Sequence, residues 1–302
     1  MKKEPIRHHY ISQFILRNFA FDESGRVLYY DKKQSAISVV EPRNIFMVKN
    51  LYRDEINNPS EPTQIEHDLA VYENEISHIL KEKFFSEREI VLNESEDSKL
   101  KLFFAIMGFR SKGASAMFGE NITEESKEMY KHYQPNGDFA DLWKRNLGYA
   151  VKCRSIQEIL NHSDIDDPFK VFFRRDTVGL LGMYFVVVES KEPDEFIIGD
   201  CYPVIINGII DWGLPLHLYS IYPISANRAV LLVDIGAEFV PRHISHLREC
   251  VLKQPKYDPH INTIRIRVKA LYPEEVQYIN TEVAENANEG FVFKKSPLYL
   301  IQ

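Results

Sequence analysis

The sequence changes character near Pro168, and this change constrains the fold more than any other feature. Before it, apolar residues recur at spacings of three and four, which is typical of helices. After it, short segments rich in β-branched and aromatic residues alternate with turn residues, which is typical of strands. Helices in one part of a sequence and strands in the other predict an α+β fold. We expect a mainly helical N-terminal part with a small hairpin, packed on a mainly antiparallel C-terminal sheet with closing helices.

The first half contains the strongest helix patterns. Thr63 to Phe84 places its apolar residues on one face, and Pro62 stands where a helix tolerates proline. Ser98 to Phe118 is apolar almost all round, which predicts a buried central helix. The other expected elements of this half are a helix from His9 to Phe21, a hairpin of Arg26–Tyr30 and Ala36–Val40, and exposed helices at Asn121–His132 and Asp138–Lys152.

The second half is expected to form the sheet. No repeat or long linker forces a domain boundary, so we expect a single domain, 1–302, with a possible subdivision into 1–165 and 166–302. The expected strands are Val171–Phe173, Leu180–Val188, Phe196–Ile198, Val204–Ile210, Leu216–Tyr222, Ala229–Val233 and Phe291–Phe293, with helices at Arg242–Leu252 and Pro273–Asn288.

Composition narrows the class of protein. The chain has 302 residues and a formal net charge of -7, so any contact with nucleic acid must come from a local basic patch. Cys153, Cys201 and Cys250 are odd in number and far apart, which argues against a disulfide framework. No apolar stretch is long enough for a signal sequence or a membrane span. We therefore expect a cytoplasmic protein that does not enter membranes.

Several short motifs recur in the order of a known family. They include His9-Tyr10-Ile11-Ser12-Gln13-Phe14-Ile15-Leu16-Arg17-Asn18-Phe19, Val27-Leu28-Tyr29-Tyr30-Asp31, Ile65-Glu66, Phe104 to Arg110, Phe196 to Pro203, Tyr222-Pro223-Ile224-Ser225, and Ile279-Asn280 leading to Phe293. Over nearly its whole length the chain resembles the bacterial domain-of-unknown-function family 4238. Asp200 and Pro203 are separated by two residues, where similar sequences usually place one. The resemblance implies a fold and not a particular activity.

A polar stripe is predicted on the first helix. His9, Gln13 and Arg17 are spaced at i, i+4 and i+8 among apolar residues. Such a stripe either faces water or brings an imidazole, an amide and a cation to one anion. The second interpretation makes His9 an acid or base and Arg17 a phosphate ligand.

Arg110 follows an apolar run, and a buried guanidinium needs a partner. Glu66 and Glu73, at i and i+7 of their helix, are the candidate partners. Arg110 is then either part of a structural Arg–Glu pair or a ligand for substrate phosphate. Glu66 and Glu73 are also weak candidates for metal ligands with Asp200. His243 and His246 lack the spacing of a metal motif, so no metal and no cofactor is expected.

Two further polar residues lie near strands or in the last helix. Asp200, between two expected strands, is either a turn residue or a general base. Asn280 shares a face with apolar residues, which favours hydrogen bonds to neighbouring backbone. Cys201, beside Asp200, is either a nucleophile or a small buried group.

Basic residues gather in three places and predict possible contacts with nucleic acid or a nucleotide. Two functions remain open. One is a ligand- or partner-binding or sensor module. The alternative is a phosphodiester-cleaving, RNase-like effector that uses His9, Arg17, Arg110 and Asp200. The basic clusters are Lys144, Arg145, Lys152 and Arg154; Lys170, Arg174 and Arg175; and Arg265, Arg267 and Lys269, with Trp143, Tyr149 and Phe173 as stacking candidates.

Overall fold

The computed structural model combines helices with mainly antiparallel sheets, which confirms the α+β class. It describes residues 7–85, 87–119, 121–131, 139–161, 179–209, 215–234, 245–295 and 297–300. The chain divides into two compact units. Unit 1 comprises residues 1–10, 47–79 and 95–181, and unit 2 comprises residues 11–46, 80–94 and 182–302. Each unit takes up several segments, whereas the sequence suggested a contiguous subdivision; the number of domains stays a prediction.

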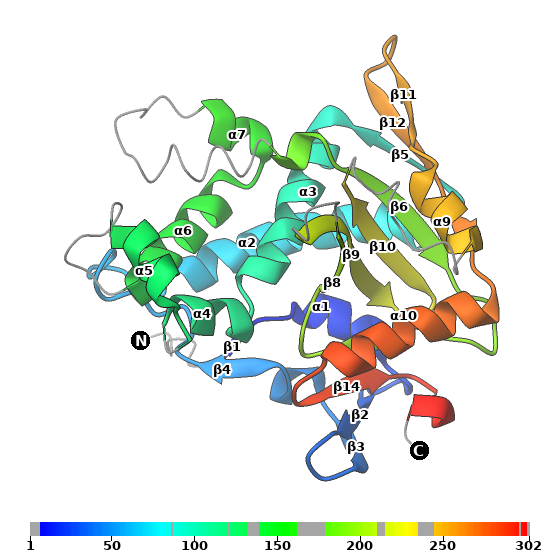
Figure 1. Ribbon diagram of the computed structural model, residues 1–302, viewed down its shortest axis with the longest axis horizontal. Coiled ribbons are helices and arrows are strands. Elements are labelled where there is room, and N and C mark those ends of the chain that lie inside the picture. Colours follow the sequence, from blue (N-terminus) through cyan, green and yellow to red (C-terminus); the bar gives the residue numbers. More distant parts are fainter. Residues whose placement is uncertain are drawn as a thin grey trace. The chain divides into compact units, whose positions relative to one another are not determined.

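Unit 1 is mainly helical (Figure 1). A short antiparallel pair joins its segments, with His8 opposite Val48. The apolar stripe predicted for the helix that begins near Thr63 is confirmed, because Ile65, Leu69, Tyr72 and Ile76 are buried. The elements of unit 1 are β1 (Arg7–His9), β4 (Met47–Lys49), α2 (Gln64–Ile79), α3 (Glu94–Phe109), α4 (Lys112–Phe118), α5 (Glu124–Lys131), α6 (Phe139–Cys153) and α7 (Ile156–Asn161).

The expected single helix from Ser98 to Phe118 is in fact two helices. α3 ends at Phe109, and Ser111 has extended backbone angles before α4 begins. The Ser111 hydroxyl accepts a hydrogen bond from the Ala114 N–H at 3.0 Å. Serine is a favoured N-cap residue because its oxygen satisfies an otherwise unpaired N–H of the first turn. The central helix α3 is buried on most of its surface, as its composition predicted.

The expected helix from His9 to Phe21 is also wrong at its start. His9 belongs to β1, and α1 runs only from Gln13 to Leu16, followed by a 3-10 turn, η1 (Arg17–Phe19). Ser12 has non-helical backbone angles, with φ -57° and ψ 127°, and the pairing of β1 with β4 fixes residues 7–9 as a strand. His9, Gln13 and Arg17 therefore do not form one helical stripe.

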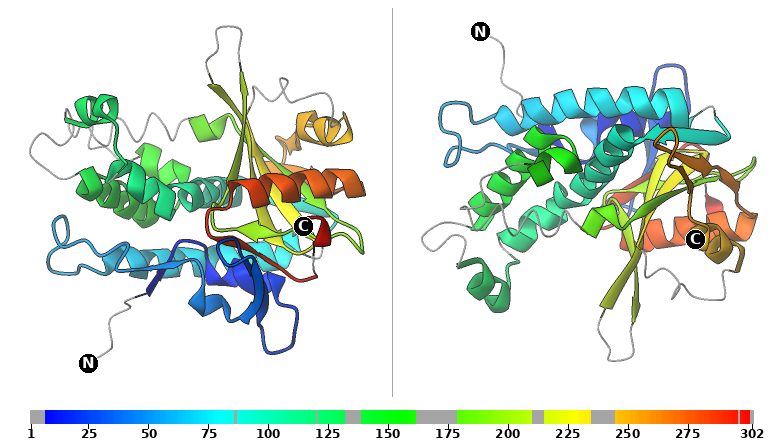
Figure 2. Two further views of the ribbon diagram at one scale, coloured as in Figure 1. Left: turned by 60° about the horizontal axis from the view of Figure 1, so that its bottom comes forward. Right: turned by 90° about the horizontal axis from the view of Figure 1, so that it is seen from above.

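The largest sheet of unit 2 has five strands in the order β13-β6-β10-β9-β8. The strands pair antiparallel except β13 with β6, so the expected antiparallel sheet is confirmed. Figures 1 and 2 show α10 running across this sheet. The elements are β6 (Tyr184–Glu189), β8 (Val204–Ile209), β9 (Pro215–Ser225), β10 (Arg228–Val233), α9 (Ser245–Leu252), β13 (Lys269–Ala270) and α10 (Pro273–Asn286).

The core of unit 2 lies between the five-stranded sheet and the two C-terminal helices. Alternate residues of the strands supply one side, as period-two patterning requires. The helices supply the other side with residues such as Leu247, Val251, Ile279 and Val283, all at most 1 % exposed. This packing fixes the positions of α9 and α10.

Two smaller sheets complete unit 2. The four-stranded sheet has the order β3-β2-β14-β7, so the last strand of the chain lies inside it. The three-stranded sheet has the order β11-β12-β5. The expected strand Val171–Phe173 falls outside the residues that the structure describes. The remaining elements are β2 (Val27–Asp31), β3 (Ala36–Val40), η2 (Pro42–Asn44), the π-helical turn η3 (Leu80–Phe84), β5 (Glu89–Asn93), β7 (Ile198–Gly199), β11 (Lys256–Asp258), β12 (Thr263–Arg267), β14 (Gly290–Phe293) and η5 (Leu298–Leu300).

Candidate functional site

The residues that the sequence singled out are divided between the two units. His9, Arg110, Glu66 and Glu73 belong to unit 1. The second group, in unit 2, comprises Gln13, Arg17, Asp200 and Asn280. Each group is described within its own unit, and the catalytic role of His9, Arg17, Arg110 and Asp200 stays a prediction.

Arg110 lies just past the end of α3 and is 2 % exposed. Its Nη1 atom forms an ion pair with Glu73 Oε1 at 2.5 Å, so the expected Arg–Glu pair is present. Its Nη2 atom donates a hydrogen bond to the backbone oxygen of His9. The guanidinium also lies 5.7 Å from the ring centroid of Tyr52. Protein groups thus hold both terminal nitrogens of this cation.

The residues around Arg110 form a buried polar network. The Tyr52 hydroxyl donates to the backbone oxygens of Arg110 at 2.9 Å and His9 at 3.3 Å. The Tyr52 N–H donates to Nδ1 of His8, whose ring stacks on the Tyr52 ring. His9 is 8 % exposed. Because buried polar groups destabilise a fold unless they are hydrogen-bonded, this network favours a structural role for Arg110 and Tyr52.

Glu66, in the first turn of α2, is partly buried beside the charges of the same network. Burial raises the pKa of its carboxyl to about 7, with Arg110 acting in the opposite direction and Glu73 in the same one. Its Oε2 atom is buried and has no hydrogen-bond partner within the described part of the chain. Burial penalises the charged form of a carboxyl, and a buried oxygen without a donor does not offset that penalty, which explains the direction of the shift.

Arg17 and Gln13 remain neighbours on α1 and η1. The Arg17 Nη2 atom donates to Gln13 Oε1 at 3.3 Å, and Arg17 is exposed. A weak contact between two surface side chains leaves the guanidinium open to water. Within unit 2 this is the part of the predicted stripe that the fold retains.

Asp200 is 8 % exposed and holds the start of β14. Its Oδ1 atom accepts hydrogen bonds from the backbone N–H groups of Glu289 at 3.1 Å and Gly290 at 3.3 Å. Burial raises the pKa of this carboxyl, while the same backbone donors lower it. These bonds reach residues 89 and 90 positions along the chain, so Asp200 ties two distant segments together, and the choice between a local turn and a general base stays a prediction.

Asn280 and Cys201 also bond within the protein. Asn280 is 1 % exposed, accepts from the Ile197 N–H at 3.0 Å and donates to the Glu195 oxygen at 2.8 Å. These are the backbone bonds that its place on an apolar helix face predicted. Cys201 Sγ lies 3.0 Å from Asn288 Nδ2, and burial raises the pKa of its thiol. In the described ranges, no group of three or more potential metal ligands comes together.

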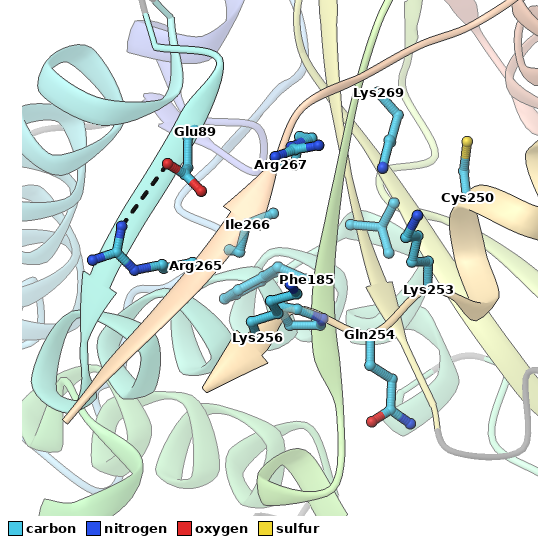
Figure 3. A pocket seen from close by; sticks show the side chains of 12 residues that line it. Glu89, Phe185, Cys250, Lys253, Gln254, Lys256, Arg265, Ile266, Arg267 and Lys269 are labelled. Atoms are coloured by element: carbon cyan, nitrogen blue, oxygen red, sulfur yellow. Dashed lines mark ion pairs between the residues drawn. The ribbon is translucent and has the colours of Figure 1, made fainter. Parts of the chain in front are cut away.

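The clearest cavity with convergent charge is in unit 2 (Figure 3). It has a volume of about 210 Å³ and lies between the three-stranded sheet, β6, β13 and the end of α9. Lys253 directly follows α9, and Lys256 begins β11. Arg265 and Arg267 come from β12, and Lys269 comes from β13. Glu89 is the acidic residue of the lining. We call this cavity the basic pocket.

The positive charge of the basic pocket is largely uncompensated. Glu89 approaches Arg265 at 3.9 Å, and both side chains are about half exposed, at 52 % and 41 %. Such an exposed pair contributes little free energy, about 0–1 kcal/mol. Within the described part of the chain, no ion pair joins the other four cations of the pocket to an acid. Phe185 and Val186 supply an apolar wall.

A family model aligns with residues 7–297, so it spans every predicted site residue and the whole basic pocket. The chain belongs to DUF4238, a protein family of unknown function. No curated protein and no solved structure matches it. The DUF4238 fold seen here is therefore interpreted from its own geometry. Among the helices described, none combines the length and the apolar character that crossing a bilayer requires.

The sequence of this DUF4238 chain identified part of the basic pocket. Arg265 and Arg267 alternate on β12, as predicted, and Lys269 follows. Lys253 and Lys256 were missed, although Lys253-Gln254-Pro255-Lys256 directly after a helix is a visible basic turn. The second basic cluster, Lys170, Arg174 and Arg175, lies outside the described residues together with Phe173. In the first cluster, Lys144 approaches Asp141 at 3.7 Å and Arg154 pairs with Glu75 at 2.6 Å.

Proposed function

We propose that this DUF4238 protein is a binding module that holds the phosphate groups of a nucleotide or of a nucleic-acid strand in the basic pocket. The observation that carries the proposal is the convergence of five basic side chains and one acid around one cavity, in a chain whose net charge is -7. An acidic protein attracts polyanions only where cations are concentrated locally. The pocket meets that condition.

The composition of the lining supports phosphate as the recognised group. Arg265 and Arg267 lie on one face of β12, and arginine binds phosphate oxygens through two parallel N–H donors. Lys253 and Lys269 add point charges, and Figure 3 shows their nitrogen ends turned towards each other in this view. A volume of about 210 Å³ accommodates a few phosphate groups and leaves the rest of a ligand outside. Phe185 offers an aromatic surface at the wall.

The alternative function, phosphodiester cleavage by His9, Arg17, Arg110 and Asp200, has less support. Arg110 is buried and both its terminal nitrogens bond to protein groups. Asp200 uses a carboxylate oxygen to hold backbone N–H groups. Residues occupied in this way favour a binding role for the protein over that particular catalytic set.

The test is calorimetric titration of the full chain with pyrophosphate, with ATP and with a short single-stranded RNA, each at low and at physiological salt. The double variant R267Q/K269Q is expected to lose at least about tenfold in affinity, because each lost charge-assisted hydrogen bond contributes about 1.5–3 kcal/mol. The control K33Q/K294Q removes the same charge from two exposed lysines outside the pocket and should bind like the wild type.

The three ligands distinguish the possible sources of phosphate. Preference for RNA with a steep salt dependence indicates a nucleic-acid strand, since several phosphates then release counterions. Preference for ATP, with an affinity that depends only weakly on salt concentration, indicates a nucleotide. The proposal is wrong if none of the three binds at millimolar concentration, or if R267Q/K269Q binds them as the wild type does.

A further inference from the structure

At the edge of the basic pocket, the thiol of a lining residue is followed by an imidazole and a carboxylate that lie behind the lining. Cys250 lines the pocket, and His246 lies one turn before it on α9. Cys250 Sγ is 3.9 Å from His246 Nε2, and His246 Nδ1 is 2.8 Å from Glu275 Oε2 on α10. The i and i+4 positions on α9 put the first two groups on one face.

Hydrogen bonds within the protein hold the carboxylate of Glu275 in place. Glu275 is 3 % exposed, and its Oε2 atom also accepts the N–H of Tyr272, the residue that caps α10. Its Oε1 atom is buried and makes no hydrogen bond to the residues described. A carboxylate in this position accepts the Nδ1–H of the imidazole and leaves the Nε2 lone pair directed at the thiol.

The imidazole of His246 is partly exposed to solvent, whereas the thiol of Cys250 is buried. The side chain of His246 is 33 % exposed, whereas Cys250 is 4 % exposed at the pocket wall. The His246 ring packs against the Tyr272 ring with centroids 4.5 Å apart, which orients it. A thiol, a base and an orienting carboxylate are the components of nucleophilic catalysis by cysteine.

We propose that Cys250 is a nucleophile that accepts an acyl group from an ester, thioester or acyl phosphate whose leaving group carries phosphate. The inference rests on the proposed function, because the basic pocket would hold the phosphate beside Cys250. His246 acts as the base, and Glu275 is a positioning residue that orients it.

In the step, the thiol proton moves from Sγ to Nε2 of His246 while Sγ forms a bond to the acyl carbon. The bond from that carbon to the leaving oxygen or sulfur breaks with its electron pair. The leaving group takes the proton from Nε2, or it departs as an anion and Nε2 releases its proton to water, so that the imidazole is neutral again. Water then attacks the acyl-cysteine, one of its protons returns to Sγ, and the carboxylic acid is released. No oxidant or reductant is needed.

The charged groups around the thiol decide how it reacts. Burial raises the pKa of Cys250 to about 11; Glu275 and Glu249 act in the same direction, and Lys269 and Lys253 act against it. At rest the sulfur is therefore a thiol and not a thiolate. Reaction near neutral pH then depends on a base beside it, which is the position of His246.

The first test uses alkylation of the full chain with iodoacetate and with iodoacetamide, followed by peptide mass spectrometry. Cys250 should react near neutral pH and should prefer the anionic reagent, because Lys253 and Lys269 attract it. Cys153, buried and 2 % exposed, is the internal reference and should stay unmodified. H246Q should lower the Cys250 rate at neutral pH by about a hundredfold, the lower end of what a positioned base contributes. It should also shift the reaction towards pH 11.

Glu275→Gln provides the second variant, since glutamine still accepts the N–H of Tyr272 and preserves the helix cap. It should lower the rate less than H246Q does, with an altered pH profile. Acetyl phosphate is the acyl probe. The wild type, but not C250S, should become acetylated at position 250. The wild type should also release phosphate from acetyl phosphate faster than the compound hydrolyses in buffer alone.

Several results would overturn the inference. Alkylation of Cys250 no faster than of Cys153, an H246Q profile identical to the wild type, or no preference for iodoacetate would each do so. Pyrophosphate binding by C250S separates the two proposals. If C250S binds pyrophosphate like the wild type while Cys250 proves unreactive, the nucleophilic role of Cys250 is wrong and the proposed binding function is retained.

Discussion

At the scale of single residues, Glu66 links the buried network of unit 1 to pH. Burial raises the pKa of its carboxyl from 4.5 to about 7, so between these values the folded chain binds more protons than the unfolded chain. The free energy of unfolding therefore falls as pH rises through this window, by up to about 3 kcal/mol. E66Q keeps a neutral side chain at every pH. We expect it to be more stable than the wild type at pH 8 and to lack this part of the pH dependence.

Urea unfolding of both proteins at pH 5 and pH 8 measures the effect. Glu61→Gln, an exposed position just before α2, is the control and should keep the wild-type pH dependence. An equal change in unfolding free energy between the two pH values for E66Q and the wild type would mean that Glu66 is ionised in the fold.

The identity of single residues predicted part of the buried network around Arg110. The rest depends on pairing between segments that are distant in the sequence. A guanidinium after an apolar run needs an acid, and Glu73 on the neighbouring helix supplies it. His9 could not be placed in the same way, because its strand depends on Met47, which is 38 residues away in the chain. Local spacing favoured a helix at His9, and the long-range pair overrode it. The pocket lysines after α9 were missed for the same reason, since their neighbours on β12 and β13 come from other segments.

At the scale of elements, β14 depends on the small size of Gly290. A Cβ atom at this position would lie 2.1 Å from the backbone oxygen of Tyr30 and 2.7 Å from the Tyr29 ring. Gly290 faces Asp31 in the β2 pairing, and the carboxylate of Asp200 binds its N–H. Gly290→Ala should therefore push β14 away from β2 and destabilise the protein by about 1–3 kcal/mol.

Thermal unfolding of G290A and the wild type measures this effect. Gly113, inside α4, is the matched control, because its Cβ would meet only the Ser111 hydroxyl at 3.8 Å. G113A should be neutral or stabilise the helix by up to about 1 kcal/mol. Equal unfolding temperatures for G290A and the wild type would contradict the close contact between β14 and β2.

Elements with a strong local pattern were predicted well, whereas the short strands β1, β4, β5 and β11 were not. The α2 stripe, β10 and the last helix follow directly from apolar spacing or β-branched composition. β14 was predicted as a final strand, yet its place inside a sheet depends on β2, more than 250 residues earlier. β5 was not predicted, although its run Ile90-Val91-Leu92 is apolar and partly β-branched, because its partner strand β12 lies about 170 residues later in the chain.

At the scale of the whole molecule, the two units are built from interleaved segments, and this determines how the chain can be divided. Residues 1–181 contain β2 and β5, whose partners β14 and β12 lie in residues 182–302. Each piece alone would expose unpaired strand edges of unit 2, which favour aggregation. Produced together, the pieces can restore both pairings.

We expect fragments 1–181 and 182–302 to be poorly soluble when produced separately and to copurify when produced together, with a tag on one of them. Val292→Pro removes a backbone donor from the interior of β14, where Val292 pairs with Tyr29 and Ile198, so it should abolish copurification. Tyr257→Ala changes an exposed residue of β11, which pairs within the second fragment, and should not affect it. Independent folding of fragment 1–181, with no gain from its partner, would show that β2 and β5 do not need the C-terminal strands. The pairings of β14 with β2 and of β12 with β5 would then contribute little to the stability of unit 2.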